Sequence, residues 1–306
     1  MTWEPYSRGF SSYYLFFIQE LIYLQVSSFF LNFVIMEQIL HFLSLGSSSS
    51  GNCYYLYSDT DGLLIDVGVG VRGLKKNFAQ YGLSMSKVHH LLVTHDHADH
   101  IKSVGSLSTD YKLNVYSTQN VHAGIDRNYC VRRKIPAEHK RYITPGEPFT
   151  IGEFKVTAFR VPHDSNDNVG YKIEWGNIVF VLMTDVGHVT DEMKAVIREA
   201  DYLVLEANHD KEMLANGHYP EHLKQRITCG TGHLNNHLCA ETLAENASEK
   251  LKHVWLCHLS EENNHPDLAL KTVTQILTDR GVLAKHPFEV TVLKRLSPTG
   301  VFDLKG

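Results

Sequence analysis

Cysteine is scarce in this chain and shows neither disulfide nor metal-binding spacing. The 306 residues contain five cysteines, and no two of them form a C-x-x-C pair. This absence argues against a disulfide framework and against a structural zinc site built on thiolates. We therefore expect reduced thiols in a cytoplasmic protein.

Strong net charge, low-complexity linkers and short repeats are also missing. The formal net charge is −5 at pH 7, so no global field attracts nucleic acid, although a local patch could. An apolar content of 43% is ample for a large core. Without a linker or a repeat, one domain from residue 37 to residue 306 is the simplest prediction.

The first 36 residues lack the features that would assign them to a known kind of leader. The hydrophobic stretch from residue 10 to residue 36 has neither a basic start nor an A-x-A cleavage pattern, which argues against a secretory signal. Its length could span a membrane, but Glu20 within it would cost about 3 kcal/mol. We favour a start-site artefact or a loose extension for residues 1–36, with a membrane anchor or a signal peptide as alternatives.

The most informative stretch follows an apolar, strand-like run over residues 88–93 and has the spacing H-x-H-x-D-H. Residues two apart at a strand end face the same side, so His95 and His97 can converge on one ion. Asp99 and His100 follow as the chain turns and can reach a second ion close by. Imidazole and carboxylate ligands suit zinc, manganese and iron.

Three further apolar strands end in a possible ligand. His163, Asp185 and His258 each follow such a strand directly. Taken alone, each would be read as an ordinary loop residue. Their common position, which holds a side chain rigidly, favours one shared metal site.

The rest of the chain alternates short strands with helices. Hairpins are predicted across residues 59–62 and 176–177, where Gly, Asp and Asn supply turn residues. Helices are predicted over residues 71–81, 190–200, 236–248 and 266–280, with a short helix starting at Ile101 and a last strand over residues 288–296. This pattern predicts an α/β fold in which two packed sheets are covered by helices.

The order H-x-H-x-D-H, His163, Asp185 and His258 resembles the metallo-β-lactamase fold superfamily, from about residue 38 to the C-terminus. More narrowly, the chain is similar to the YycJ/WalJ group in its segments S-L-G-S-S-S-S-G-N, T-D-V-G-H, G-H-L-N-N and C-H-L-S-E-E-N-N. That group is regarded as a family of 5′→3′ DNA exonucleases related to tRNase Z. The resemblance implies a four-layer αββα fold with two mixed sheets and a metal-dependent hydrolase acting on nucleic acid.

The resemblance also implies two divalent ions per chain, Zn²⁺ or Mn²⁺. It assigns one ion to His95, His97 and His163 and the other to Asp99, His100 and His258, with Asp185 bridging them. Two such ions would acidify a shared water, which Asp99 could orient.

Two catalytic candidates come from the same resemblance. His233 matches a histidine that contacts the scissile phosphate in tRNase Z-like relatives, and Glu206 matches the glutamate that holds it. A histidine kept cationic by a carboxylate can stabilise developing charge or protonate a leaving oxygen. A structural loop residue is the alternative for His233, and the role of His188 stays open.

Spacing excludes several relatives. Only 72 residues separate Asp185 from His258, too few for an inserted β-CASP domain, and the 21 residues between His163 and Asp185 leave no room for the tRNA-gripping arm of tRNase Z. His97 stands where flavodiiron proteins have Glu, which favours hydrolysis over redox chemistry. A small-ester hydrolase (lactonase, thioesterase or cyclic phosphodiesterase) and a non-catalytic binding protein remain as alternatives.

One segment favours a polyanionic partner. Between residues 127 and 141 six basic residues stand against the single acid Glu138, and Arg132, Arg133 and Lys134 are its nucleic-acid contact candidates. A solvated loop with a basic bias is the alternative. No dedicated protein partner is indicated, and a membrane would be a partner only if residues 10–36 are an anchor.

Overall fold

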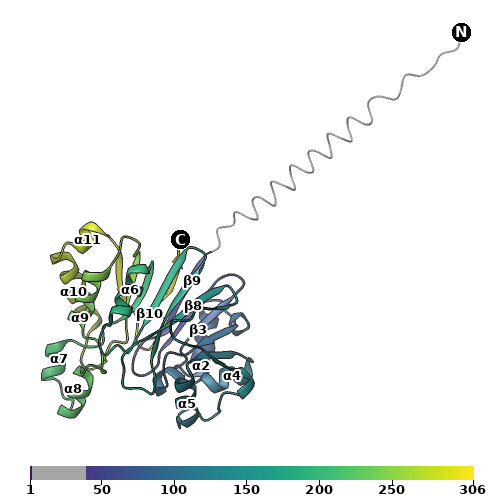
Figure 1. Ribbon diagram of the computed structural model, residues 1–306, viewed down its shortest axis with the longest axis horizontal. Coiled ribbons are helices and arrows are strands. Elements are labelled where there is room, and N and C mark those ends of the chain that lie inside the picture. The colour runs from purple at the N-terminus through teal and green to yellow at the C-terminus, as the bar shows by residue number, and fades with distance from the viewer. Residues whose placement is uncertain (2–38) are drawn as a thin grey trace. The chain divides into compact units, whose positions relative to one another are not determined.

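Two seven-stranded β-sheets packed face to face form the body of the protein (Figure 1). The computed structural model describes residue 1 and residues 39–306, so the interpretation of residues 1–36 lies outside the described part of the chain. Residues 39–306 make one compact unit.

The first sheet has the strand order β14-β1-β2-β3-β4-β5-β6. Its strands are β1 (Leu40–Gly46), β2 (Cys53–Tyr57), β3 (Gly62–Ile65), β4 (His90–Leu92), β5 (Asn114–Ser117), β6 (Lys140–Tyr142) and β14 (Val301–Leu304). Strands β3 to β6 run parallel to one another, so their carboxyl ends lie at one edge.

The second sheet has the strand order β13-β12-β11-β10-β9-β8-β7. Its strands are β7 (Phe149–Ile151), β8 (Phe154–Arg160), β9 (Val169–Trp175), β10 (Ile178–Met183), β11 (Tyr202–Glu206), β12 (His253–Cys257) and β13 (Glu289–Val292). Here β10 to β13 are the parallel half.

Strands that are apolar on both faces explain why each sheet is buried on both sides. Phe180 and Leu182 of β10 lie in the layer between the sheets, whereas Val181 and Met183 pack toward the helices outside. Successive side chains of a strand point to opposite faces, so a continuous apolar run fills both layers.

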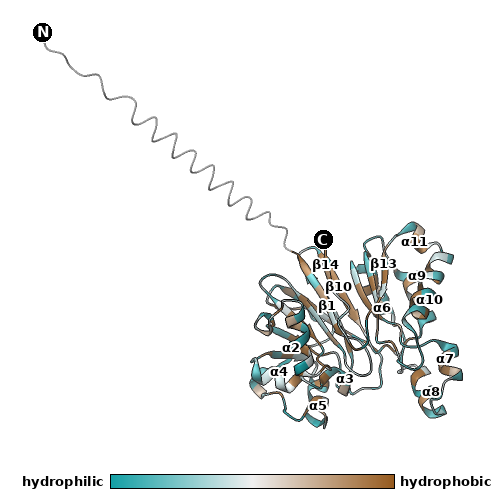
Figure 2. Cartoon of the chain, turned by 180° about the vertical axis from the view of Figure 1, so that it is seen from behind, coloured by the Kyte–Doolittle hydropathy of each residue, from teal (hydrophilic) through white to brown (hydrophobic). Residues whose placement is uncertain are grey.

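Helices form the two outer layers (Figures 1 and 2). The first sheet is covered by α2 (Val71–Gln80), α3 (Ala98–Ile101), α4 (Val104–Asp110) and α5 (Gln119–Arg127), and the second by α6 (Asp191–Glu199), α9 (Asn236–Asn246), α10 (Pro266–Asp279) and α11 (Val282–Lys285). The other helical segments of residues 39–306 are α7 (Lys211–Asn216), α8 (Glu221–Thr228) and two 3₁₀ turns, Met85–Lys87 and Ala137–His139. Within residues 39–306, no helix is both long and apolar enough to cross a membrane.

This arrangement confirms the predicted αββα fold class, and both predicted hairpins form: β2 pairs with β3 and β9 with β10, antiparallel. Other element predictions need correction. Where a short helix was expected from Ile101, the chain forms α3, which ends at Ile101, and then α4, which begins at Val104. The strands predicted over residues 88–93 and 288–296 are shorter, and β6 and β14 were not predicted.

Strand β14 pairs antiparallel with β1 at one end of the first sheet. Leu40 lies opposite Leu304, and Leu43 lies opposite Val301. The last strand of the described chain therefore completes the sheet that the first strand begins.

Candidate metal centre

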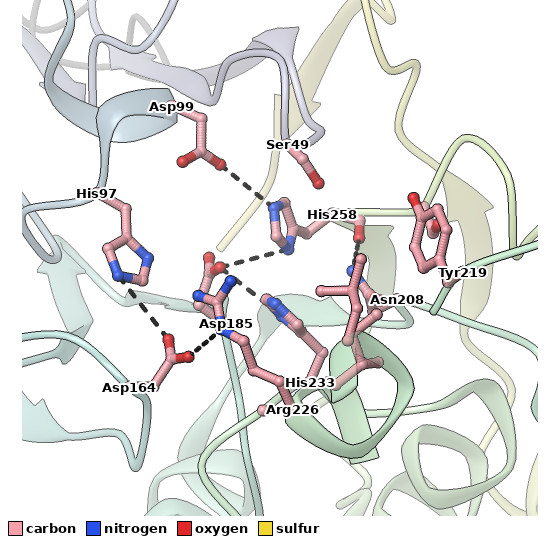
Figure 3. Close-up of a pocket in the computed structure, with 14 residues that line it drawn as sticks. Ser49, His97, Asp99, Asp164, Asp185, Asn208, Tyr219, Arg226, His233 and His258 are labelled. Atoms are coloured by element: carbon pink, nitrogen blue, oxygen red, sulfur yellow. Dashed lines mark hydrogen bonds and ion pairs between the residues drawn. The ribbon is translucent and has the colours of Figure 1, made fainter. Parts of the chain in front are cut away.

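Histidine and carboxylate side chains converge where the parallel halves of the two sheets end (Figure 3). They are Asp66 after β3, His95 and His97 after β4, Asp185 after β10, Glu206 at the end of β11 and His258 after β12, joined by Asp99 and His100 on α3 and by His163 after β8. In α/β proteins the carboxyl ends of parallel strands commonly carry the ligand site. All seven metal ligands predicted from the sequence lie at this edge.

One cluster consists of His95, His97 and His163, whose ligand atoms lie within 4.8 Å of one another. The Nδ1 atom of His163 donates to the carbonyl of Gly232 at 3.1 Å, and its Nε2 lies 3.3 Å from Nδ1 of His97. The Nε2 atom of His95 is buried and has no hydrogen-bond partner. Burial lowers the pKa of His95 and His163, which keeps both imidazoles neutral and able to bind a metal.

A second cluster consists of Asp99, His100 and His258. The Oδ2 atom of Asp99 lies 3.4 Å from Nε2 of His100 and 3.5 Å from Nε2 of His258. The latter nitrogen is also buried without a hydrogen-bond partner. Two buried nitrogens without partners, one in each cluster, fit metal ions, because such atoms otherwise lose hydration with nothing in return.

Asp185 connects the two clusters. Its Oδ2 atom lies 3.2 Å from Nε2 of His100, and its Oδ1 atom lies 3.6 Å from Nε2 of His163. Burial raises the pKa of Asp185, but the charges of His258 and His100 hold it well below the usual range, so this carboxylate is anionic.

The carboxylates of the centre stabilise the protonated form of His258. Burial lowers the pKa of His258, but Asp185, Asp99 and Glu206 together raise it to about 10. Divalent cations can replace such protons, since histidine ligands give up their protons on binding. Nitrogen and oxygen donors without a thiolate suit Zn²⁺, Mn²⁺ or iron.

Asp66 orients His100, a role that the sequence analysis missed. Its Oδ2 atom lies 2.7 Å from Nδ1 of His100 and accepts the hydroxyl of Thr94 at 2.8 Å, while Oδ1 accepts the Thr94 amide at 2.8 Å. This contact turns Nε2 of His100 toward Asp99 and Asp185 and is typical of carboxylates behind metal-binding histidines. The only signal in the sequence is an acid directly after a buried strand.

Backbone strain marks the same edge. Asp66, Asp185 and His258 have φ values of 57°, 57° and 53°, in the left-handed region that non-glycine residues seldom adopt. Each costs about 1–3 kcal/mol, which the surroundings must offset. The side-chain amides of Asn168 and Asn208 do so in part by donating to the carbonyls of Asp185 at 3.0 Å and His258 at 2.8 Å.

Glu206 and His233 are in contact, as the sequence analysis predicted. The Oε1 atom of Glu206 lies 2.9 Å from Nδ1 of His233 and 2.8 Å from Nδ1 of His258, while its Oε2 accepts the backbone amides of Val186 and Leu234 at 2.8 and 2.9 Å. Burial raises the pKa of Glu206, but the charge of His233 and hydrogen bonds from both histidines lower it to about 2. Burial in turn lowers the pKa of His233, and Glu206 and Asp185 raise it above its usual value.

A cavity of about 230 Å³ opens over both clusters. His97, Asp99, Asp185, His233 and His258 line it. Arg226 and Asp164 were not predicted as functional residues, yet both line the same cavity and form an ion pair. They are 62 residues apart in the chain, so no local pattern connects them.

The remaining candidates lie outside this cavity. His188 contacts the carbonyl of Gly230 at 2.7 Å. In the basic segment, Arg133 pairs with Asp110 at 2.5 Å, and Lys134 donates to the carbonyls of residues 125 and 128. Part of the positive charge counted in the sequence is therefore already paired, and Arg132 is exposed.

The chain is similar to known proteins in sequence and in fold. The family model "Beta-lactamase superfamily domain" matches residues 62–258. "Exodeoxyribonuclease YycJ" of Bacillus anthracis is 36% identical over 262 residues, which cover 86% of this chain and 98% of that protein. "Exodeoxyribonuclease WalJ" of Streptococcus pneumoniae serotype 2 is 34% identical over 240 residues, covering 78% and 89% respectively. The crystal structure of the metallo-β-lactamase fold protein YhfI from Bacillus subtilis has a TM-score of 0.65 at 19% identity, covering 87% of this chain and all of that one (100%).

Proposed function

Because this chain belongs to the beta-lactamase superfamily of metal-dependent hydrolases, and within it to the YycJ/WalJ group, we propose that it hydrolyses phosphodiester bonds in nucleic acid. The finer proposal is a 5′→3′ DNA exonuclease. Near full-length similarity to two proteins named exodeoxyribonuclease supports the substrate class. The proposed direction of cleavage rests on the resemblance to the YycJ/WalJ group alone.

The observation that carries the proposal is the contact between Glu206 and His233 beside the metal clusters. A lactone or a thioester needs one oxyanion stabilised, whereas a phosphodiester carries charge on two further oxygens. A cationic histidine next to the metal ligands can stabilise the charge on these further oxygens, so it fits a phosphodiester better than a lactone or a thioester.

His95, His97 and His163 would hold one divalent ion, and Asp99, His100 and His258 a second, with Asp185 between them. When bound, such ions bring the pKa of a shared water toward about 7 and polarise the phosphate oxygens. Zn²⁺ and Mn²⁺ are the candidates for both positions.

The protein's own groups position and protonate the substrate. Nδ1 of His233 faces Glu206, which leaves Nε2 to donate a hydrogen bond or a proton to the leaving oxygen. Glu206 keeps His233 cationic, and its buried carboxylate is itself fixed by two backbone amides. Asp99 would accept a hydrogen bond from the attacking water and so orient it.

Residues 37–306 are the catalytic domain in this proposal, and Arg132, Arg133 and Lys134 contact the nucleic acid outside the cavity. A chain that begins at Met36 should therefore keep full activity. If instead the full chain partitions into membranes and the shortened chain is inactive, residues 1–36 are an anchor and part of the working protein.

The test uses end-labelled single- and double-stranded DNA and RNA with Mn²⁺ or Zn²⁺. We expect stepwise release of nucleotides from the 5′ end of DNA, and none from the His97→Ala variant. Release from the 3′ end would overturn the direction alone. If all four substrates stay intact while a lactone or a thioester is hydrolysed, the protein is a small-ester hydrolase.

A further inference from the structure

The cavity over the metal clusters has one wall that the proposed chemistry leaves without a role. That wall is formed by α8 and by Tyr219, two residues before it, with Leu223, Arg226 and Ile227 also lining the cavity (Figure 3). At about 230 Å³ the cavity is smaller than the roughly 300–1,000 Å³ of pockets that enclose a whole drug-sized ligand. A nucleic acid can therefore enter it only with one end or one nucleotide, and contacts along the wall decide how that part is held.

Arg226 is the only lysine or arginine among the residues that line this cavity. Its Nε atom donates to Oδ2 of Asp164 at 2.5 Å, and its side chain is 58% exposed. Within residues 39–306, no hydrogen bond occupies its two terminal nitrogens, so their N–H groups are free for a ligand. A guanidinium presents these donors as a planar fork that matches two oxygens of one phosphate.

Asp164 fixes the position of this fork relative to the metal ligands. Its Oδ1 atom lies 3.4 Å from Nε2 of His163 and 3.8 Å from Nε2 of His97, while Oδ2 accepts Nε of Arg226. One carboxylate thus stands between Arg226 and the histidine cluster. This carboxylate holds the guanidinium beside the histidine cluster, next to the place where the scissile phosphate would bind.

Resting on the proposed function, we propose that Arg226 binds the phosphate group that neighbours the scissile phosphate, and that Asp164 is its positioning residue. The neighbouring phosphate is either a terminal 5′-phosphate or the next diester of the strand, and both offer the same oxygens to the fork. If the ion pair had no such role, replacing Arg226 would leave the affinity for DNA unchanged.

The experiment compares substrates that differ in the number of phosphates. Wild type, Arg226→Ala, Arg226→Lys and Asp164→Asn are assayed on a single-stranded DNA oligonucleotide with a 5′-phosphate, on the same strand with a 5′-hydroxyl, and on bis(p-nitrophenyl) phosphate, which has one phosphate only. Arg72→Ala is the matched control, because Arg72 is an exposed arginine of α2 outside the cavity. Metal content is measured for every variant.

We expect Arg226→Ala to raise the KM for DNA about 10- to 100-fold, the range for a lost charge-assisted hydrogen-bonded pair, with little change in KM for the one-phosphate ester. Arg226→Lys should recover part of this loss, since it restores the charge without the fork. Asp164→Asn should raise the KM for DNA less than Arg226→Ala, with metal content unchanged. If the KM rises only for the 5′-phosphorylated strand, Arg226 binds the terminal phosphate. If the KM rises equally for both strands, Arg226 binds the next diester.

A binding measurement keeps the proposal falsifiable without turnover. With a phosphorothioate-linked oligonucleotide, Arg226→Ala should reduce the slope of log K against log salt by roughly 0.7, the contribution of one phosphate contact on a single strand. Arg72→Ala should leave the slope unchanged.

Three results would overturn the inference. If wild type cleaves DNA and Arg226→Ala has the same KM and the same salt slope, Arg226 binds no phosphate, while the proposed function stands. If Arg226→Ala loses activity on DNA and on the one-phosphate ester to the same extent, Arg226 supports the metal centre and does not bind the neighbouring phosphate. If wild type neither cleaves nor binds any oligonucleotide, the proposed function fails first, and the inference fails with it.

Discussion

The Oε1 atom of Glu206 lies 2.9 Å from Nδ1 of His233, and the carboxylate that makes this contact is fully buried. The same atom lies 2.8 Å from Nδ1 of His258, a candidate metal ligand. One carboxylate therefore orients both a catalytic candidate and a ligand, so the metal centre and the proton donor are coupled through Glu206.

Replacing His233 tests the proton donor. His233→Ala should slow nuclease turnover by about 10²–10⁴-fold, the usual range for a positioned acid. Metal content should stay unchanged, because His233 is not a proposed ligand. His237→Ala on α9 is the control, since His237 is exposed and should not affect turnover. Equal activity of the two variants in a nuclease assay would remove His233 from the reaction.

Replacing Glu206 tests the coupling. Glu206→Gln keeps the shape but removes the charge that helps to raise the pKa of His233. A lower pKa means that His233 loses its proton at lower pH, so the alkaline limb of the pH–rate profile should move to lower pH. The check is the profile of kcat for wild type and variant. An unmoved alkaline limb would show that His233 does not act as the acid.

Metal analysis tests the centre directly. Protein purified without chelator should contain more than one transition-metal ion per chain by elemental analysis. His97→Ala should lower that number and abolish activity, yet leave most of the fold by circular dichroism, because His97 is only partly buried at the edge of the sheets. Fully folded wild-type protein without metal would contradict the two-ion proposal.

Charge reversal tests the basic segment. Arg132→Glu should weaken DNA binding. For single-stranded DNA it should also reduce the slope of log K against log salt by roughly 0.7. Arg133→Glu is less informative, because Arg133 already pairs with Asp110 and its reversal would place two acids together. The measurement is the affinity for DNA over a salt series, with Arg72→Glu as control. Identical slopes for wild type and Arg132→Glu would exclude a phosphate contact there.

Acid stability should depend on His209, which is 1% exposed and has an unpartnered Nδ1 atom. Burial lowers the pKa of His209 from 6.5 to about 4, so the unfolded chain binds a proton more readily than the folded one. The contribution of His209 to the free energy of unfolding is therefore fully present above pH 6.5. It falls by up to about 3 kcal/mol as the pH drops toward 4.

His209→Gln should flatten this loss between pH 7 and pH 5 in denaturant titrations. The exposed His222 of α8 supplies the control variant, His222→Gln, which should keep the wild-type slope. A His209→Gln protein that loses stability as steeply as wild type would show that other groups control the acid transition.

Local signals predicted that the proposed ligands lie together, because His95, His97, His163, Asp185 and His258 follow apolar runs that form buried strands. His95 and His97 are two residues apart in the chain that follows β4, so the alternation of side chains in extended backbone predicted their convergence. The roles of Asp66 and of the pair Asp164 and Arg226 could not be predicted, since each depends on partners brought close by the fold. Strand β14 was missed for the same reason: four residues are too few for a clear pattern, and pairing with β1 forms the strand.

The pairing of Leu40 with Leu304 also sets an order of events during synthesis. Strand β1 is synthesised long before its partner β14, so the first sheet stays open at this edge until residues 301–304 have been made. Until then the edge of β1 exposes unpaired backbone groups to other strands. Ribosome stalling or a premature stop before Val301 should therefore yield an aggregation-prone product, although every proposed metal ligand has already been synthesised.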